Sequence, residues 1–175
     1  MSTPTNPSFD IAHLAHVEMF TDRFDERLDF FTRIYGLKLS GQDDTSAYHL
    51  FFADGLASPG SDLTFFDWPV PREQRGTNSI TRTALRVAGA DTIHWWENRI
   101  KDAGLKYRPA EIRDSRLTLD FEDPEGQRLS LVQGGPHGIP WEGSTVPTDK
   151  QIHGLGPSEL TLPNLFPTTR VLERA

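Results

Sequence analysis

Two side chains near the N-terminus have the chemistry of metal ligands or of an acid–base pair. His16 and Glu18 lie two residues apart in the segment 11–20, IAHLAHVEMF, whose β-branched and aromatic residues predict a β-strand. Alternate residues of a strand share a face, so the imidazole and the carboxylate would lie close enough to bind one divalent metal ion. The same spacing also suits an acid–imidazole contact without a metal, and the sequence leaves both interpretations open.

The remaining histidines form no further constellation. His94, His137 and His153 fall on a predicted helix flank, in a predicted linker and at its end, with no shared spacing. His49, in AYHLFFA, is expected to pack or to form hydrogen bonds across strands. The chain has no cysteine, which excludes disulfides, thiolate zinc sites, iron–sulfur clusters and cysteine nucleophiles. It also lacks a glycine-rich phosphate loop, a Gly-x-Ser-x-Gly elbow and a His-Glu-x-x-His helix.

The composition excludes several classes of partner. The chain has 175 residues, 36% of them hydrophobic, and a net charge of −7, which is typical of a soluble globular protein that does not bind nucleic acid. No apolar run approaches the ~18–20 residues of a membrane span. Residues 1–9 lack the basic start and the apolar stretch of a signal peptide, so a cytoplasmic protein is the default expectation.

A strand–helix–three-strand unit is predicted in the first half of the chain. The strand over 11–20 leads into an amphipathic helix over 22–35, and Gly36 is placed to cap that helix. The apolar stripe of the helix consists of Phe24, Leu28, Phe31 and Tyr35. Three short strands are predicted to follow, at 37–40, 47–53 and 62–68.

The same order of elements returns in the second half. A strand over 79–87 is followed by a helix over 91–103, with Gly104 as its cap. The buried stripe of this helix consists of Ile93, Trp96, Ile100 and Ala103. Strands are then predicted at 105–109, 117–121 and 127–132. This repetition predicts an α+β fold in which two tandem βαβββ modules form one curved mixed sheet with the helices on its outer face.

A partial third unit follows the two modules. The segment GGPHGIPWEGSTVPTDK has no periodicity, and after it a strand over 154–163 and the first turns of a helix over 165–175 are predicted. The expected organisation is a flexible N-terminus at 1–10, a paired domain at 11–133 made of modules 11–68 and 79–133, a linker at 134–153 and the truncated start of a second domain at 154–175.

Several segments of the chain resemble one protein family. Paired modules with an Asp-Pro-x-Gly turn before the last strand, here Asp123 to Gly126, resemble the vicinal oxygen chelate superfamily of glyoxalase I, bleomycin-resistance proteins and extradiol ring-cleaving dioxygenases. LDFFTRIYGLKL, AYHLFFADGLASPG, DLTFFDWP and FEDPEGQRLSLV look like the N-terminal half of the ring-cleaving dioxygenases that act on hydroquinones. VPTDKQIHGL is similar to the bridge into the second half of those proteins. The resemblance covers nearly all of residues 12–175.

The resemblance implies a metal site to which this chain contributes one part. Proteins of that group have four modules and a single iron(II) held by two histidines and a glutamate, and Mn(II) is the alternative metal for this chain. One of the histidines maps to His16, and Glu18 is a further candidate, whereas the other two ligands belong to a fourth module that this sequence lacks. The family pattern has a histidine just before the first ligand and a threonine two residues after it, where this chain has Ala15 and Glu18.

The other ligand positions that the superfamily uses carry hydroxyls in this chain. Superfamily ligands lie on the first and last strands of modules, which maps them to Thr64, to Thr81 or Thr83, and to Ser130. Neutral hydroxyls are poor ligands for divalent transition metals. The chain is therefore expected to hold metal only if residues outside it complete the site.

Three functions follow as hypotheses. The first is the N-terminal half of an iron(II)-dependent extradiol dioxygenase for hydroquinone- or catechol-like aromatics, with a missing C-terminal half as its partner. The second is a metal-free module of the bleomycin-resistance type, without a cofactor, in which a homodimer encloses small molecules in aromatic clefts. The residues expected to line those clefts are Phe20, Phe51, Phe65 and Phe66. The third is a truncated product with no independent function.

Overall fold

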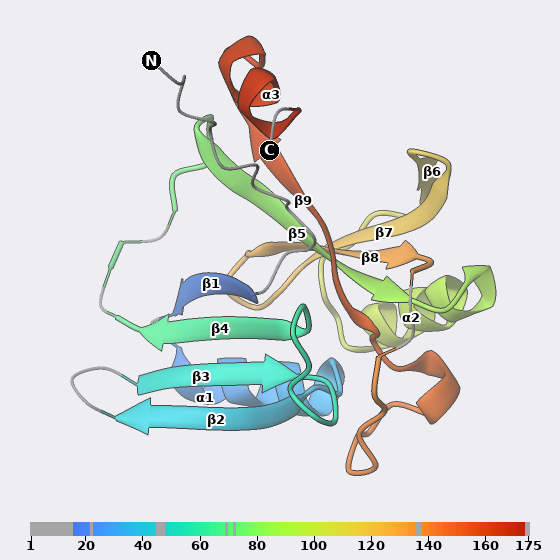
Figure 1. Ribbon diagram of the computed structural model, residues 1–175. Helices are drawn as coiled ribbons and strands as arrows, with labels where there is room; N and C mark the ends of the chain where they lie inside the picture. Colours follow the sequence, from blue (N-terminus) through green and yellow to red (C-terminus); the bar gives the residue numbers. More distant parts are fainter. Residues whose placement is uncertain are drawn as a thin grey trace, which may run out of the picture.

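The computed structural model of the protein describes residues 16–21, 23–44, 48–68, 70–71, 73–135 and 138–173. The side chains at positions 16, 18, 20, 42–44 and 48 lie outside the described part, as does the N-terminal segment 1–10. Within these limits the fold is α+β, as the sequence predicts, and Figure 1 shows the order of its elements.

The first sheet contains the strands of the first module in the order β1-β4-β3-β2. β1 (His16–Thr21) runs parallel to β4 (Asp62–Asp67), and β3 (Tyr48–Ala53) and β2 (Lys38–Asp44) extend the sheet by antiparallel pairing. The fully buried side chains of the middle strands alternate along the chain: Leu50, Phe52, Leu63 and Phe65. This alternation is typical of a sheet that is covered by helix on one face. We call this sheet A and its other surface the helix-free face.

The second sheet, sheet B, has the order β6-β7-β8-β5-β9. β5 (Ser79–Val87) is parallel to β8 (Arg128–Gln133), just as β1 is parallel to β4. The antiparallel strands β7 (Arg116–Glu122) and β6 (Glu111–Arg113) lie beyond β8. On the opposite edge of β5 lies β9 (Gly154–Thr161), the strand predicted for the third unit, which pairs with β5 in the antiparallel direction.

The two modules therefore do not form the single curved sheet that the sequence predicts. Each first strand is hydrogen-bonded along one edge to the last strand of its own module. The other edge of β5 is occupied by β9, and a strand has only two edges, so β1 cannot pair there. The described part of the chain supplies no partner strand for the second edge of β1.

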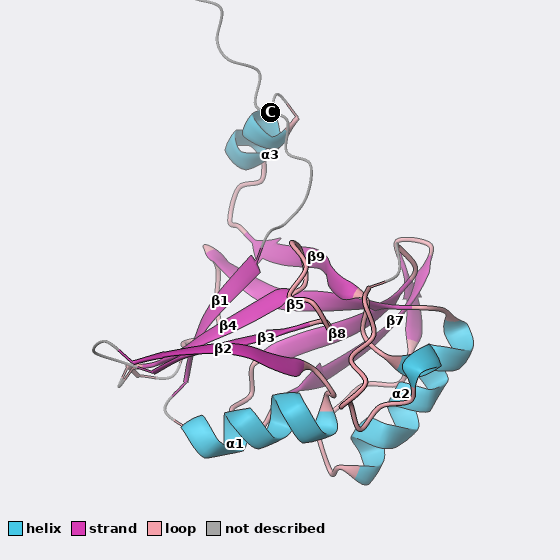
Figure 2. Ribbon diagram, turned by 60° about the horizontal axis from the view of Figure 1, so that its bottom comes forward, coloured by secondary structure: helices cyan, strands magenta, loops and turns pink. Residues whose placement is uncertain are grey.

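Helices from both modules cover the same side of the sheets (Figure 2). α1 (Phe24–Asp29) continues as a π-helical turn at Phe30–Ile34, and α2 (Ala90–Asp102) is its counterpart in the second module. Each is followed by a glycine with positive φ, 73° at Gly36 and 70° at Gly104, which confirms the predicted caps. No helix in the described ranges combines the length and the apolar character needed to cross a membrane.

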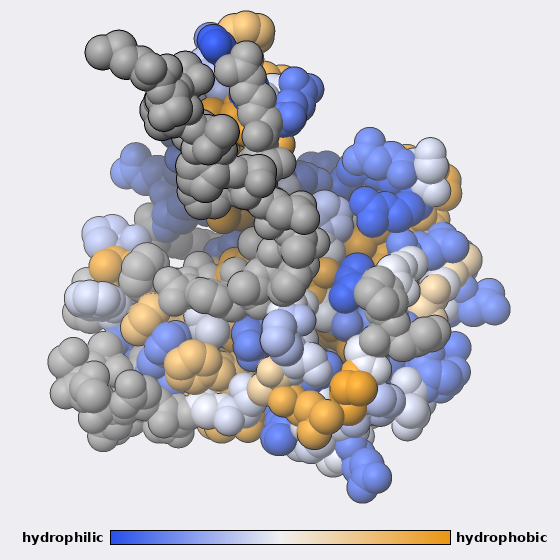
Figure 3. All heavy atoms as spheres, viewed as in Figure 1, coloured by the Kyte–Doolittle hydropathy of each residue, from blue (hydrophilic) through white to orange (hydrophobic). Residues whose placement is uncertain are grey.

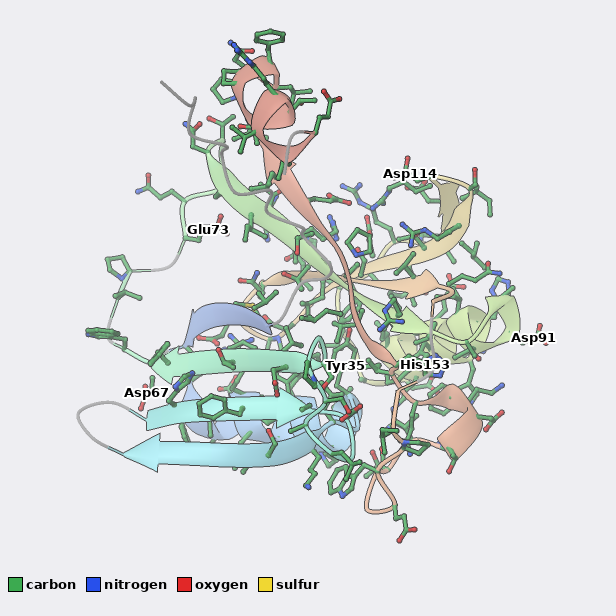
Figure 4. All side chains as sticks on the ribbon, in the orientation of Figure 1. Tyr35, Asp67, Glu73, Asp91, Asp114 and His153 are labelled. Carbon is green, nitrogen blue, oxygen red and sulfur yellow. The ribbon has the colours of Figure 1, made fainter. Side chains whose placement is uncertain are left out.

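One apolar core joins the two modules. Tyr35, at the end of the first helix, lies between them (Figure 4), with its ring centroid 5.5 Å from that of Trp96 on α2 and 5.6 Å from that of Phe121 on β7. All three side chains are buried, as the helical stripe predicts for Tyr35 and Trp96. Burial of each large apolar side chain contributes about 1.5–3 kcal/mol, so the two modules stabilise one another.

The structure corrects one predicted strand of the second module. Residues 105–109 form a single isolated bridge, between Tyr107 and Phe121, whereas the strand that pairs regularly with β7 is β6. Beside this bridge the backbone N–H of Arg108 donates to the carbonyl oxygen of Asp120, and the pairing with β7 then shifts by one residue before Glu111. Such a bulge interrupts the ladder, so regular pairing begins only at Glu111.

The segment predicted as a linker packs against both modules over its described residues, 138–153. Val146 is buried beside Gly36, where a Cβ on the glycine would lie 2.5 Å from a Val146 methyl carbon. The indole N–H of Trp96 donates to the carbonyl oxygen of Lys150 at 2.8 Å. These contacts fix the path of the segment into β9.

α3 (Phe166–Leu172) follows β9 and projects away from the sheets in both ribbon views (Figures 1 and 2). Its larger apolar side chains are exposed, with 71% of Phe166, 66% of Val171 and 55% of Leu172 accessible to solvent. Large exposed apolar groups on one short helix are typical of surfaces that bind another segment.

Candidate functional site

Positions 16 and 18 belong to the helix-free face of sheet A. Val17 and Met19 are buried on the side covered by α1, in parallel register with Leu63 and Phe65 of β4. Because neighbouring residues of a strand alternate between faces, positions 16 and 18 fall on the opposite face. Their backbones are in register with Asp62 and Thr64, and the side chains of His16 and Glu18 lie outside the described part of the structure.

Thr64 is the neighbour of position 18 on this face. Its side chain is buried, and its hydroxyl donates to the carbonyl oxygen of Val17 at 3.4 Å. A neutral hydroxyl engaged with a carbonyl group is a poor metal ligand. On the other side of Thr64, Phe51 of β3 is its register partner. Position 18, Thr64 and Phe51 therefore lie side by side across three neighbouring strands.

His49 lies among aromatic rings rather than among metal donors. Its ring centroid is 3.8 Å from that of Phe66, in a stacked arrangement, and 4.0 Å from that of Phe51. The expected cross-strand packing of His49 is thereby confirmed. Figure 3 shows hydrophobic residues lying over β3 and β4 on this side of the molecule, among hydrophilic ones. We call Phe51, Phe66 and His49 the aromatic patch.

The aromatic residues expected to line a ligand cleft are divided between the two faces of sheet A. Phe51 and Phe66 are half-buried on the helix-free face, whereas Phe65 is fully buried beneath α1, where its ring centroid is 4.7 Å from that of Phe31. Adjacent residues of a strand point to opposite faces, so Phe65 and Phe66 cannot line the same cleft. The side chain of Phe20 lies outside the described residues.

In the second module, the position that corresponds to His16 is Arg82. Ala84 is in parallel register with Ser130, as Glu18 is with Thr64, and Arg82 lies two residues before Ala84. The predicted alternatives, Thr81 and Thr83, are therefore wrong by one residue. Thr83 is buried on the α2 side, in register with Leu129. A shift of one residue in the alignment of a strand moves each position to the other face of the sheet. Aligning the sequences of the two modules does not reveal such a shift.

Arg82 belongs to an ion-pair network on the helix-free face of sheet B. Asp120 lies at its centre, with nitrogen–oxygen distances of 3.4 Å to Arg82 and 2.6 Å to Arg113. The hydroxyl of Ser130 donates to Asp120 at 2.6 Å, and Glu159 of β9 accepts from Arg113 at 2.8 Å. We call these residues the Asp120 network. It joins all five strands of sheet B, with Arg113 on β6, and it engages the Ser130 hydroxyl, which the family resemblance marks as a ligand position.

The pKa of Asp120 shows how strongly this network compensates its charge. Burial raises the pKa of the carboxyl, but hydrogen bonds from Arg113 and Ser130, together with the charge of Arg82, outweigh burial and hold the pKa below its usual value. The carboxylate is thus ionised at neutral pH and already paired with two guanidinium groups. The network thus has a structural role, and the Asp120 carboxylate is already occupied by its partners.

The described residues do not fit a complete metal site. No group of three or more histidine, aspartate or glutamate side chains lies within reach of one ion in the described ranges. The second-module counterpart of His16 is a guanidinium, which repels cations. His94 is an exposed α2 residue 3.5 Å from Glu97, and His153 lies in the packed segment before β9. A metal at position 16 would need ligands from outside this chain.

A second charged cluster, which sequence reasoning does not reveal, joins the two modules. Arg27 of α1 forms buried ion pairs with Asp123 and Glu125. The Asp123–Gly126 segment is a turn, as predicted, in which the Asp123 carboxylate accepts from the backbone N–H of Glu125 and of Gln127, each at 2.9 Å. Arg27 and Asp123 are 96 residues apart in the chain, and no local pattern links them.

Comparison with known proteins identifies the family of this chain and proteins that are similar to it. The family model described as Glyoxalase/Bleomycin resistance protein/Dioxygenase superfamily matches residues 13–131. The putative ring-cleaving dioxygenase MhqA of Bacillus subtilis (strain 168) is 39% identical over 165 residues, which are 90% of this chain and 52% of MhqA. The chlorohydroquinone/hydroquinone 1,2-dioxygenase of Sphingobium indicum is 26% identical over 114 residues, 61% of this chain and 35% of that protein.

A solved structure matches most of the fold. The crystal structure of a putative dioxygenase from Bacillus subtilis subsp. subtilis str. 168 superposes with a TM-score of 0.83 at 27% identity. The match covers 92% of this chain and 53% of that one. The chain therefore spans about half the length of MhqA and of this structure.

Proposed function

Since this chain belongs to the Glyoxalase/Bleomycin resistance protein/Dioxygenase superfamily, we propose that it is the N-terminal half of an iron(II)-dependent extradiol ring-cleaving dioxygenase. In this proposal His16 is one ligand of the metal, which is iron(II) or, in its place, Mn(II). Glu18 is a further candidate ligand. The substrate is a hydroquinone- or catechol-like aromatic, and the remaining ligands belong to a second half outside this chain.

The pairing of β9 with β5 is the observation that carries this proposal. A strand beyond the second module already completes the open edge of sheet B, and α3 after it exposes apolar side chains. The corresponding edge of β1 has no strand partner among the described residues. A further module beside β1 would complete sheet A in the same way and would bring new side chains to the face of position 16.

The length of the relatives supports the same interpretation. MhqA extends over about twice the span that this chain matches, because the match covers 52% of it. The names of MhqA and of the Sphingobium relative describe ring cleavage and, for the latter, hydroquinone substrates. The aromatic patch supports an aromatic substrate in this chain, because flat rings pack well against Phe51 and Phe66.

Metal content tests the proposal. The chain would be purified alone and joined to a C-terminal half taken from MhqA, and iron and manganese would be measured by elemental analysis. We expect less than one metal ion per chain alone and about one in the joined protein, lost in His16→Ala because one of three ligands is removed.

Thr64→Val is the matched control, since it alters the same face without removing a metal donor, and it should keep the metal. Retention of a full equivalent of metal by His16→Ala in the joined protein would rule out the ligand role. A full equivalent in the chain alone would rule out a site shared with a second half.

The aromatic patch also favours a second candidate function, a metal-free small-molecule binding module. His49 stacked on Phe66 at 3.8 Å offers an aromatic surface without any metal donor beside it in the described residues. Size-exclusion chromatography with the same elemental analysis distinguishes the candidates. A homodimer without metal that binds aromatic compounds would favour this second function.

A further inference from the structure

A cavity of about 650 Å³ lies between the two modules. Its walls come from β1, from the start of β5, from the 123–127 turn and from the connector between β4 and β5, on which Glu73 lies (Figure 4). The lining residues of β1 are Val17, Met19 and Thr21, which alternate with positions 16 and 18. A molecule in this cavity would therefore lie on the other side of β1 from the face of the proposed metal ligand.

The charged groups around the cavity are compensated within the protein. Arg27 pairs with Asp123 and Glu125. Arg75 lies 3.0 Å from a carboxylate oxygen of Glu122, and this contact raises the pKa of Arg75. Arg23, which also lines the cavity, lies 3.0 Å from a carboxylate oxygen of Glu26. Because these three cations already have carboxylate partners, the cavity does not require a charged ligand.

The remaining wall of the cavity combines apolar side chains with the polar side chains of Thr21, Ser79 and Gln127. Val17 and Met19 form a buried inner wall, with 6% and 7% of their surfaces exposed. Val70 and Ile80 line the cavity and remain 41% and 48% exposed. Ligand sites for small molecules in proteins typically enclose about 300–1,000 Å³ with mainly apolar walls and a few polar groups, and this cavity lies within that range.

Thr83 supplies a polar group at the cavity that the fold does not use. Its side chain is fully buried, and its hydroxyl has no hydrogen-bond partner among the described residues. Thr81, two residues earlier, instead donates to the carbonyl oxygen of Glu159 at 3.2 Å. A buried hydroxyl without a partner is unfavourable, and valine would fill the same volume without this cost. In this structure the hydroxyl is closed off from solvent, so a bound molecule reaches it only when the neighbouring side chains move aside.

We propose that this cavity is a second small-molecule site, which takes an uncharged, mainly apolar ring compound bearing one hydroxyl. The ring packs against Val17, Met19 and Ile80, and its hydroxyl forms a hydrogen bond with that of Thr83. The site is independent of the proposed metal centre, because it uses the opposite face of β1 and needs no residue from outside this chain.

Met19 gives a direct measurement of binding. With ¹³C-methyl-labelled methionine, the Met19 signal reports on the cavity wall, and an added standard calibrates its chemical shift. The chain would be titrated with p-cresol and, in parallel, with toluene, which has the same ring and methyl group without the hydroxyl. We expect both compounds to shift the Met19 signal and p-cresol to bind more tightly.

Two variants decide the assignment. Thr83→Val should weaken p-cresol binding about five- to tenfold, the effect of one neutral hydrogen bond, and should leave toluene binding unchanged. Ile80→Trp, at a half-exposed position, should fill the cavity and weaken both compounds, and it keeps the test decisive if Thr83→Val folds poorly. The site is refuted if Met19 does not respond to p-cresol at millimolar concentration, if Ile80→Trp binds like the parent chain, or if a folded Thr83→Val loses no preference for p-cresol.

Discussion

The first strands of the two modules, β1 and β5, pair in the same way within their own modules. They differ in what lies along their other edges and on their helix-free faces. Each runs parallel to the last strand of its own module. β5 is hydrogen-bonded on both edges, and its helix-free face holds Arg82 within the Asp120 network. β1 has one partner strand among the described residues, and position 16 lies on a face with Thr64 and the aromatic patch. The repeated strand pairing thus fixes which positions lie on each face of the sheet. The neighbouring strands and the residue types at those positions then determine the chemistry of that face.

The contacts between the modules are similarly unequal. Arg27 of the first module is buried against Asp123 and Glu125 of the second module. Arg99 of the second module contacts the end of the first helix, where it donates to the carbonyl oxygen of Ile34 at 2.8 Å. Its side chain remains partly exposed. The buried contact should therefore matter more for stability than the exposed one.

Arg27→Met should have the largest effect, because it removes the buried cation at the module boundary. The Arg27 guanidinium lies 4.6 Å from the centre of the Phe65 ring as well as against its two carboxylates. Methionine keeps much of the volume but not the charge, so the free energy of unfolding should fall by about 3–5 kcal/mol. Urea denaturation followed by tryptophan fluorescence measures the change.

Arg33→Met is the matched control for that substitution. Arg33 forms an exposed pair with Asp29, at 2.7 Å and four residues apart on the same helix. Such surface pairs contribute little to stability, because water screens the two charges. Equal losses from the two variants would contradict the buried role of Arg27.

Asp120→Asn should have an intermediate effect, because it removes the charge at the centre of the sheet B network. Charged hydrogen bonds of this kind each contribute about 1.5–3 kcal/mol, and we expect a loss of about 2–3 kcal/mol at pH 7. Thr64→Val, on the helix-free face of sheet A, is the comparison, because the Thr64 hydroxyl makes one neutral hydrogen bond, to the carbonyl oxygen of Val17. A loss as large for Thr64 would show that the two faces do not differ as proposed.

The effect of Asp120→Asn should depend on pH in a defined direction. Since the folded pKa of Asp120 lies below its usual value, its charge stabilises the fold above the unfolded pKa of about 3.9. That contribution is lost as pH falls through the lower folded pKa. Thermal unfolding should therefore show the full difference between parent and variant at pH 7 and a shrinking difference below about pH 4.

Tyr35→Phe should have the smallest effect on the free energy of unfolding. It tests whether the Tyr35 hydroxyl contributes to the core that the two modules share. The Tyr35 hydroxyl is buried without a hydrogen-bond partner among the described residues, and burial raises the pKa of this phenol well above its usual value. Removing the hydroxyl should leave stability unchanged or raise it by up to about 1 kcal/mol. A clear loss of stability in urea denaturation would show that the hydroxyl has a partner, such as a buried water molecule.

Much of the secondary structure could be predicted because its signals are local. The apolar stripe that includes Phe31 and Tyr35 is buried, and Gly36 and Gly104 cap their helices with positive φ. The face of Thr83 could not be predicted, because the loop before β5 leaves the register open by one residue. The Asp120 network was also missed, since its members come from strands distant in sequence.

The sequence by itself determined the order of elements, the α+β class, the helix caps and the presence of His16 and Glu18 on one strand. Periodicity and glycine placement carry these features, because each depends on residues a few positions apart. The tertiary structure alone decided that β9 pairs with β5, that the sheets are separate and that Arg82 is the residue of the second module that corresponds to position 16. Edge pairing and face register depend on contacts between distant segments, which alternation within a single strand does not specify.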